Sequence, residues 1–312
     1  MKREFFREVA AQGAHLLTPL AANPASHEGK LAFRLFPPML VHYLDLTPAT
    51  YYAIQYALGI ATLSAVAWLL HDMGYTRRTA FALVVALSFT YVGAVWFLDT
   101  QPYFDAIAVS ALLLSMCARR PELVVVAVSV ALWTDERAIL PAVVVAVWHL
   151  RRGNRAGAVA VGLAFAGYVA VRAFLSTRYE LATAPNGIGL STAFELWKTT
   201  PIGVLLALEG LWVVVVCGLV QAFRVRERSA FTVLLCVCGS TASSVVVYDV
   251  TRSLVYLLPV VVIAASYLLE ANAHLRERAL TAAVVLCVFV PTTSVMVDRF
   301  ATWVPVLARV VF

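Results

Sequence analysis

Apolar runs long enough to cross much of a lipid bilayer recur along the whole 312-residue chain, and they limit its possible folds more than any other feature. A transmembrane helix needs about 20 consecutive apolar residues. Hydrophobic residues make up 62% of the chain and charged residues only 13%, a balance that soluble domains of this size do not have. The sequence therefore predicts an all-α fold, a polytopic transmembrane helix bundle of about nine to ten membrane segments. The runs lie at 51–70, 79–98, 104–118, 123–133, 138–150, 156–171, 203–223, 229–248, 253–269 and 279–297.

Three consecutive ionisable residues, Asp135, Glu136 and Arg137, interrupt the otherwise apolar stretch from Leu123 to Leu150. An Asp or Arg at the centre of a spanning helix costs roughly 2.5 to 3.5 kcal/mol, so these side chains should not face lipid. The 11 uncharged residues that begin at Leu123 reach only ~17 Å into a hydrocarbon core of ~30 Å. We therefore expect a re-entrant pair of half-helices whose bend presents the charges to a polar pocket. The alternative is one long tilted helix of 28 residues.

The arginine distribution orients the chain if the stretch from 123 to 150 returns to the side from which it started. Five connections then fall on one side and contain twelve of the 24 basic residues but only five of the 18 acids. Because positive charge collects in cytoplasmic loops, this side is predicted to be cytoplasmic. The net charge of +6 then reflects topology and contact with membrane lipids, and it gives no support for nucleic-acid binding. The twelve residues are Arg77, Arg78, Arg119, Arg120, Arg151, Arg152, Arg155, Arg224, Arg226, Arg228, Arg276 and Arg278.

The chain is predicted to contain one large membrane domain with two short flanks. Residues 1–48 form a non-cytoplasmic amphipathic N-terminal segment, 49–297 the transmembrane helical domain, and 298–312 a non-cytoplasmic C-terminal tail. The first 22 residues have no continuous apolar core, so they are neither a signal peptide nor a spanning helix. An alternative is that a preceding transmembrane helix is missing from the start of the gene.

Charged residues gather in the segments that are predicted to open to the non-cytoplasmic side. Carboxylates serve as general bases or as ligands of a divalent cation, and guanidinium groups bind phosphate through two hydrogen bonds. An enzyme that moves a group from a lipid-linked phosphate donor needs both kinds of side chain near one interface. The acids are Asp99, Asp105, Asp135, Glu136 and Asp249, and the arginines are Arg34, Arg137 and Arg252.

Structural roles compete for several of these residues. Asp105 is placed to cap a helix, Asp249 and Arg252 are placed to pair with each other, and Arg34 is placed to anchor an interface. Arg172 and Glu209, near the outer ends of their runs, are expected to form a structural ion pair. The sequence has no P-loop, no GxGxxG after a strand, no HExxH and no GxSxG.

The order of these features resembles the bacterial GT-C superfamily of polytopic glycosyltransferases. The matching pieces are RLFPPML at 34–40, Asp105 at the start of a short helix, the acids at 135 and 136, and Asp249 with Arg252 before a proline-bearing helix. The resemblance implies sugar transfer from a polyprenyl-phosphate donor at the outer face of the bacterial cytoplasmic (inner) membrane. It further implies that Asp135 or Glu136 acts as the base or as the ligand of a divalent cation. Asp105 would be a second acid, Arg137 and Arg252 would bind the donor phosphate, and Arg34 and Asp249 would add to substrate binding.

One departure separates the chain from that superfamily. Its members usually carry an essential Asp in the first outer loop, just after a first transmembrane helix, and Glu4 and Glu8 are the only acids near that place here. This departure fits a truncated start or a non-catalytic relative. Two competing classes therefore remain: a transporter or lipid flippase, and a non-catalytic GT-C-like membrane subunit whose charges pair only with each other.

Overall fold

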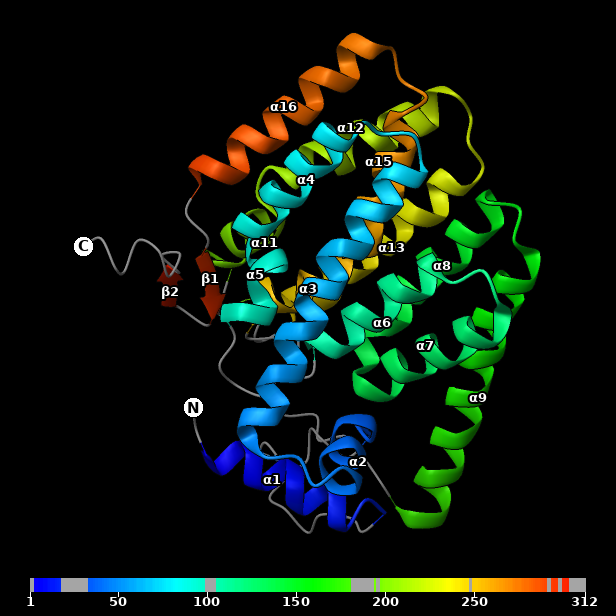
Figure 1. The fold of residues 1–312 in the computed structure, drawn as a ribbon, viewed down its shortest axis with the longest axis vertical. Helices are drawn as coiled ribbons and strands as arrows, with labels where there is room; N and C mark the ends of the chain where they lie inside the picture. Colours follow the sequence, from blue (N-terminus) through cyan, green and yellow to red (C-terminus); the bar gives the residue numbers. More distant parts are fainter. Residues whose placement is uncertain are drawn as a thin grey trace. The chain divides into compact units, whose positions relative to one another are not determined.

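The structure is a computed structural model that describes residues 3–17, 33–98, 105–180, 194, 197–246, 249–290, 293–296 and 299–302 (Figure 1). These residues are mainly helical, as predicted, and include one short antiparallel strand pair, β1 (Thr293–Met296) with β2 (Arg299–Thr302). Residues 298 and 303–312 of the predicted C-terminal tail lie outside the described ranges. The chain divides into two compact units, and one helix, α3 (Pro48–Asp72), continues from the first into the second.

The first unit comprises residues 1–62 and 99–187. It contains the beginning of α3 together with α1 (Arg3–Ala14), α2 (Phe36–Tyr43), α6 (Asp105–Cys117), α7 (Pro121–Thr134), the short 3-10 helix η2 (Glu136–Ala138), α8 (Ile139–Arg151) and α9 (Arg155–Tyr179). Helix α7 begins with a proline, whose missing N–H costs nothing in the first helical turn. Helix α9 begins after Asn154, whose side chain accepts the N–H of Gly157 at 2.9 Å.

The amphipathic N-terminal segment folds into α1, but its apolar side packs on protein. Phe6 and Val9 are buried in a cluster with Val41 of α2, Tyr51 of α3 and Ile107 of α6. The apolar surface that suggested a helix lying on the membrane is therefore used inside the first unit. Hydrophobic periodicity marks a buried face without identifying what covers it, and the interfacial location of the segment stays a prediction.

Helix α6 is the most buried helix of the first unit and is tied to its neighbours by hydrogen bonds. The Thr62 hydroxyl donates to Ser110 at 2.8 Å, which joins α3 to α6. The Trp148 indole donates to the carbonyl of Met116 at 2.9 Å, which joins α8 to α6. Helices α6 and α9 each pack against both α7 and α8. These contacts fix the ends of α6, α7 and α8 around the candidate site.

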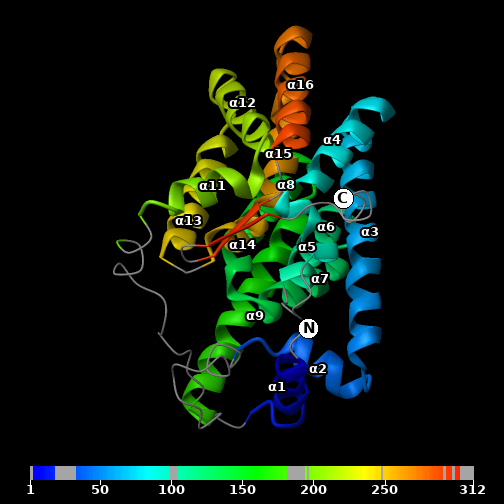
Figure 2. The same ribbon diagram turned by 90° about the vertical axis from the view of Figure 1, so that its left-hand side faces the viewer.

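The second unit comprises residues 63–98 and 188–312. Its elements are the end of α3, α4 (Arg77–Phe89), α5 (Tyr91–Leu98), α11 (Thr200–Leu208), α12 (Leu211–Arg224), α13 (Ser229–Val245), α14 (Val250–Ser253), the 3-10 helix η3 (Leu254–Leu257), α15 (Leu258–Leu268), α16 (Ala273–Phe289) and the strand pair. Helix α15 is almost completely buried and packs on α12, which packs in turn on α16 (Figure 2).

Two apolar runs that were expected to be single helices are bent instead. The run at 79–98 breaks at Thr90, where α4 and α5 meet at 73°, and the run at 203–223 breaks between α11 and α12 at 84°. The run at 279–297 also differs from expectation, because α16 ends at Phe289 and residues 293–296 form β1. Hydropathy alone does not register these bends, since Thr90 and Glu209 are single polar residues in largely apolar runs.

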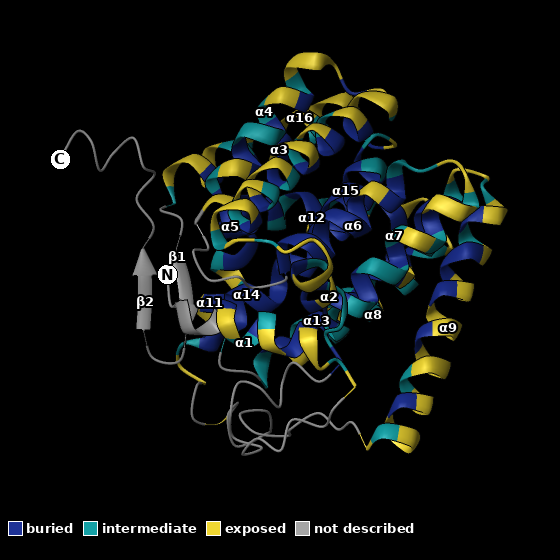
Figure 3. Ribbon diagram, turned by 60° about the horizontal axis from the view of Figure 1, so that its bottom comes forward, coloured by how far each residue is buried: buried dark blue, intermediate teal, exposed yellow. Residues whose placement is uncertain are grey.

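Three helical stretches among the described residues are long and apolar enough to cross a membrane: α3, α9 and the continuous stretch from Val250 to Leu268. The number rises to five if each bent pair forms one span. Helix α9 exposes apolar side chains along most of its length (Figure 3), including Val159, Leu163 and Phe174. The finer count of nine to ten membrane segments stays a prediction.

Candidate functional site

The predicted break in the 123–150 stretch is confirmed, and Asp135 builds it. Helix α7 ends at Thr134, and Asp135 follows in extended conformation with φ −158° and ψ 133°. The Asp135 carboxylate turns back to accept the backbone N–H of Arg137 at 2.9 Å, which caps η2. Helix α8 then starts at Ile139. The alternative of one unbroken helix through these residues is therefore wrong.

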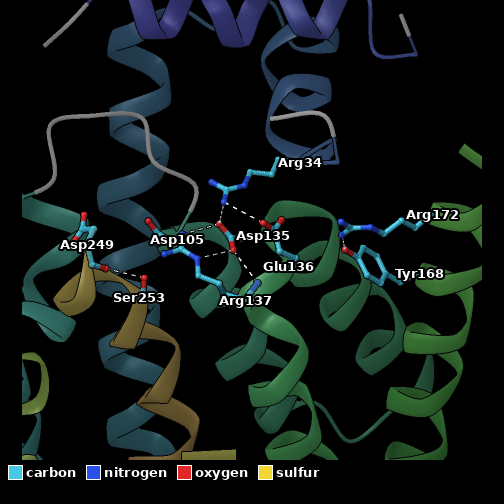
Figure 4. Close-up of polar contacts among 9 residues, drawn as sticks. All are labelled: Arg34, Asp105, Asp135, Glu136, Arg137, Tyr168, Arg172, Asp249 and Ser253. Atoms are coloured by element: carbon cyan, nitrogen blue, oxygen red, sulfur yellow. Dashed lines mark hydrogen bonds and ion pairs between the residues drawn. The ribbon is translucent and has the colours of Figure 1, made fainter. Parts of the chain in front are cut away.

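Five charged side chains from three separate segments meet at this break (Figure 4). The Arg137 guanidinium donates from Nη2 to Asp105 at 2.6 Å and to Asp135 at 2.8 Å, and from Nε to Asp135 at 2.9 Å. Arg34, just before α2, places Nη2 at 3.0 Å from Asp135 and at 3.6 Å from Glu136. We call these five residues the charge cluster.

Exposure divides the three acids of the charge cluster into two kinds. The side chains of Asp105 and Asp135 are buried, whereas that of Glu136 is 34% exposed. Burial alone would raise the pKa of the Asp135 carboxyl, but the guanidinium groups of Arg137 and Arg34 outweigh burial and hold that pKa well below its ordinary value of 3.8. Asp135 is therefore ionised and already bound by Arg34 and Arg137, while Glu136 is the accessible carboxylate.

A third arginine, which sequence reasoning did not place here, lies beside the charge cluster. Arg172 of α9 stacks its guanidinium on Phe33, 4.2 Å from the ring centre, and donates a hydrogen bond to the Tyr168 hydroxyl. Figure 4 shows Tyr168 and Arg172 next to Glu136, and all three belong to the first unit. No carboxylate of the described residues pairs with Arg172.

The predicted partner of Arg172 is therefore wrong, because its guanidinium lies on two aromatic rings and not on Glu209. A sequence signal for the observed contact existed. Tyr168 and Arg172 are four residues apart, on one helix face, and Phe33 directly precedes Arg34. The spacing of apolar residues does not predict which residue of another segment packs on that helix face.

Arg34 adds a second guanidinium with an unused donor. Its Nη2 is engaged by Asp135 and Glu136, but its buried Nε has no hydrogen-bond partner in the part of the chain that the structure describes. A buried N–H without an acceptor is unfavourable by about 1–3 kcal/mol, and such groups often mark a place for a ligand or water. The edge of the charge cluster thus presents the Arg34 guanidinium and the Glu136 carboxylate, with the Arg172 guanidinium beside them.

Two of the other predicted residues belong to the second unit, and one is not described. Asp249 and Arg252 belong to the second unit, where Asp249 caps α14 by accepting the backbone N–H of Arg252 at 3.2 Å. Figure 4 shows the neighbouring bond, which the Ser253 hydroxyl donates to the carbonyl oxygen of Asp249. Asp99 lies outside the described residues. The structure therefore brings together five of the seven residues that were predicted as catalytic or substrate-binding: Arg34, Asp105, Asp135, Glu136 and Arg137.

A divalent cation does not fit these residues well. Among the described residues no group of three or more His, Cys, Asp or Glu side chains is arranged to hold a metal ion. The oxygens of Asp105 and Asp135 that face the centre of the charge cluster accept hydrogen bonds from Arg137. A cation there would have to displace a guanidinium from both carboxylates.

The charge cluster thus combines a buried, mutually neutralising core with an accessible acid and two guanidinium groups at its edge. Chemically, that edge can accept a proton and bind an oxyanion. Comparisons with known proteins add nothing to this geometry, because no family model, no curated protein and no solved structure matches the chain.

Proposed function

We propose that this chain is an integral membrane glycosyltransferase that transfers a sugar from a polyprenyl-phosphate donor at the non-cytoplasmic face of the bacterial inner membrane. The observation that carries the proposal is the edge of the charge cluster, where the 34% exposed carboxylate of Glu136 lies 3.6 Å from the Arg34 guanidinium and Arg172 donates to the neighbouring Tyr168 (Figure 4). A group transfer from a lipid phosphate needs an acceptor for one proton and cations for the departing phosphate.

The exposed apolar surface of α9 supports a membrane location. Val159, Leu163 and Phe174 are each more than half exposed although they are large and apolar. Monomeric soluble proteins rarely expose continuous apolar surface of this kind. In a bilayer the same side chains face lipid, and the membrane also supplies the hydrophobic medium that a polyprenyl chain requires.

Charge development explains why arginines should surround the scissile bond. A sugar joined to polyprenyl phosphate is a phosphodiester with one negative charge, and the polyprenyl monophosphate that leaves carries nearly two, since its second pKa is about 6. Guanidinium groups therefore bind the departing phosphate more strongly than the intact donor. Only interactions that strengthen in this way lower the barrier.

Glu136 is the acid that can take the proton. The hydroxyl of the acceptor attacks the anomeric carbon, the bond from that carbon to the phosphate oxygen breaks, and the hydroxyl proton passes to the Glu136 carboxylate. Asp135 suits this role less, because two guanidinium groups hold it ionised and buried. Asp135, Asp105 and Arg137 instead position the turn that carries Glu136.

One observation favours a second candidate, a non-catalytic membrane subunit. Asp105 and Asp135 are both engaged by Arg137, as expected for charges that only hold helices together. The two candidates differ in whether the edge of the charge cluster binds a lipid phosphate, which a purely structural ion network would not do.

Binding of undecaprenyl phosphate to the purified protein in detergent, compared with undecaprenol, tests the proposal. The two lipids differ only in the phosphate, so preferential binding of the phosphate form measures the oxyanion site. Arg172→Gln should weaken undecaprenyl phosphate binding by about 10- to 100-fold, the equivalent of about 1.5–3 kcal/mol for a hydrogen bond to a charged group. Undecaprenol binding should not change. Equal binding of both lipids by the unmodified protein would refute the transferase and leave the structural subunit.

Glu136→Gln separates chemistry from binding. Because Glu136 is proposed to act on the acceptor proton, this variant should bind undecaprenyl phosphate normally. It should lose transfer from polyprenyl-phosphate hexoses or pentoses by about 10²- to 10⁴-fold. Unchanged transfer in the variant would remove Glu136 from the mechanism.

A further inference from the structure

The bend between α11 and α12 in the second unit contains the least satisfied acid of the described residues. Glu209 is the residue that ends α11, and its backbone has φ 48° and ψ −123°. Residues with a Cβ rarely adopt a positive φ, so this conformation is kept only where the surrounding structure imposes it. The two helices on either side of Glu209 meet at 84°.

The Glu209 side chain is buried without a polar partner. Only 6% of the residue is exposed, and neither carboxyl oxygen has a hydrogen-bond partner among the described residues. Asp135 shows the opposite arrangement, since two arginines and a backbone N–H engage its buried carboxylate. Without a cation beside it, a carboxyl costs far more free energy to bury in its ionised form than in its neutral, protonated form.

Helix α16 closes the other side of the bend. A Cβ on Gly210 would lie 2.2 Å from the carbonyl oxygen of Ala283, so the backbones of the bend and α16 are in direct contact. Cys287 of α16 is fully buried, accepts the N–H groups of Gly210 and Leu211 at its sulfur, and interacts electrostatically with Glu209. Glu209 thus lies under a close helix contact with a thiol beside it.

No Lys, Arg or His among the described residues forms an ion pair with the Glu209 carboxyl. The elements that pack on α11 and α12 include α14 with Arg252 and η3 with Tyr256, as well as α5, α13, α15 and α16. Among the described residues, the Cys287 thiol is the one titratable side chain that interacts with Glu209. The surroundings of this carboxyl are therefore those of a group that binds a proton.

We propose that Glu209 is a reversible proton-binding site at the bend between α11 and α12, with the carboxyl in its neutral, protonated form at neutral pH. Loss of the proton leaves an isolated carboxylate under α16, which water or a cation can reach only where α12 and α16 separate. Proton release and local opening of this contact are therefore coupled. The site lies in the second unit and uses none of the residues proposed for sugar transfer.

Labelling with dicyclohexylcarbodiimide tests the protonation state directly. This apolar reagent takes the proton of a neutral carboxyl onto one of its nitrogens, and the carboxylate adds to its central carbon. A shift of the acyl group to nitrogen then leaves a stable N-acylurea. Peptide mass spectrometry of the protein in detergent should find the adduct at Glu209 near neutral pH, with a yield at least fivefold above that of the exposed Glu277. The yield should decline as the pH is raised.

Glu209→Gln provides a readout that does not depend on reagent access. Gln has the shape of a protonated Glu, so the variant should unfold at the same temperature as the unmodified protein near neutral pH. The carboxylic-acid C=O band that disappears in alkaline infrared difference spectra should be missing in the variant. An ion-paired Glu209 would instead give a large loss of stability on substitution.

Two results would overturn the proposal. One is no carbodiimide adduct at Glu209 together with no change in that infrared band between neutral and alkaline pH. The other is an adduct that does form at Glu209 but in a yield no greater than that at Glu277. Neither measurement uses lipid phosphate or sugar transfer, so failure here leaves the proposed transferase untouched, and failure of the transferase leaves this proposal standing.

Discussion

Replacing Asp135 with Asn should destabilise the first unit far more than replacing its neighbour Glu136 with Gln. Both changes remove one negative charge and keep the shape of the side chain. They differ in what surrounds the carboxylate. Asp135 is buried and accepts hydrogen bonds from the backbone N–H, Nε and Nη2 of Arg137, and it also pairs with Arg34. Glu136 is one-third exposed and has one ion pair, at 3.6 Å.

The contacts set the expected magnitudes. In Asp135→Asn the amide oxygen can still cap η2. The amide NH₂ cannot accept hydrogen bonds from the guanidinium groups, because it is itself a donor. Removing one partner of a buried ion pair costs about 3–5 kcal/mol. We take the lower end, about 3 kcal/mol, because Arg137 keeps Asp105 and because Arg34 and Arg137 remain 16% and 21% exposed. For Glu136→Gln we expect less than about 1 kcal/mol.

Thermal unfolding in detergent at low ionic strength, followed by circular dichroism, measures this difference. A loss of about 3 kcal/mol corresponds to a decrease of about 6–12 °C in the midpoint of a 150- to 250-residue domain, and the Gln variant should shift by less than about 4 °C. Equal shifts in the two variants would show that Asp135 does not hold the break together. Glu136→Gln is therefore a cleaner test of catalysis than neutralising Asp135 and Glu136 together, because the double change also disturbs the fold.

Three further predictions concern stability in the same assay. Gly210→Ala should lower the unfolding midpoint by the equivalent of about 1–3 kcal/mol, because its Cβ would lie 2.2 Å from the Ala283 carbonyl oxygen, whereas Gly162→Ala, with open space around its Cβ, should be neutral or stabilising. Acidification should narrow the gap between the unmodified protein and Asp135→Asn. The depressed pKa of Asp135 means that its contribution is complete above the ordinary value of 3.8 and declines below it, so a gap that is unchanged in acid contradicts this assignment. Tyr75→Phe should cost about 1 kcal/mol, because the buried Tyr75 hydroxyl donates to a backbone carbonyl of α15 at 2.8 Å, and no change in midpoint would mean that this bond contributes nothing.

Part of the charge cluster could be predicted from the sequence, because charged side chains in an apolar environment need water or partners of opposite charge. Three ionisable residues in an otherwise apolar stretch of 28 positions were not expected to face lipid, and Arg34 and Asp105 were expected on the same side of the membrane. The structure joins these segments through Arg137 and Asp135. Capping chemistry likewise anticipated the role of Asp249 at the start of α14.

Other features could not be predicted because they depend on which surfaces meet. The apolar face of α1 was visible in the sequence, but only tertiary structure shows that Tyr51 and Ile107 cover it. The bend at Glu209 left no trace in hydropathy, since a single acid among apolar residues also fits a straight helix. Arg172 was assigned by depth along α9, which says nothing about the rotation of the helix toward Phe33.

The break at Asp135 gives two neighbouring acids different environments. The Asp135 carboxylate turns inward to Arg137, whereas the Glu136 side chain is 34% exposed, and Nη2 of Arg34 contacts both carboxylates. Asp105 and Asp135 balance the charges of Arg137 and Arg34, and the buried core is therefore close to neutral. In the proposed function, the buried acids therefore do not repel a phosphate at the edge, and the Arg172 guanidinium is the group proposed to bind it. One change of backbone direction therefore provides both the support of the site and its accessible acid.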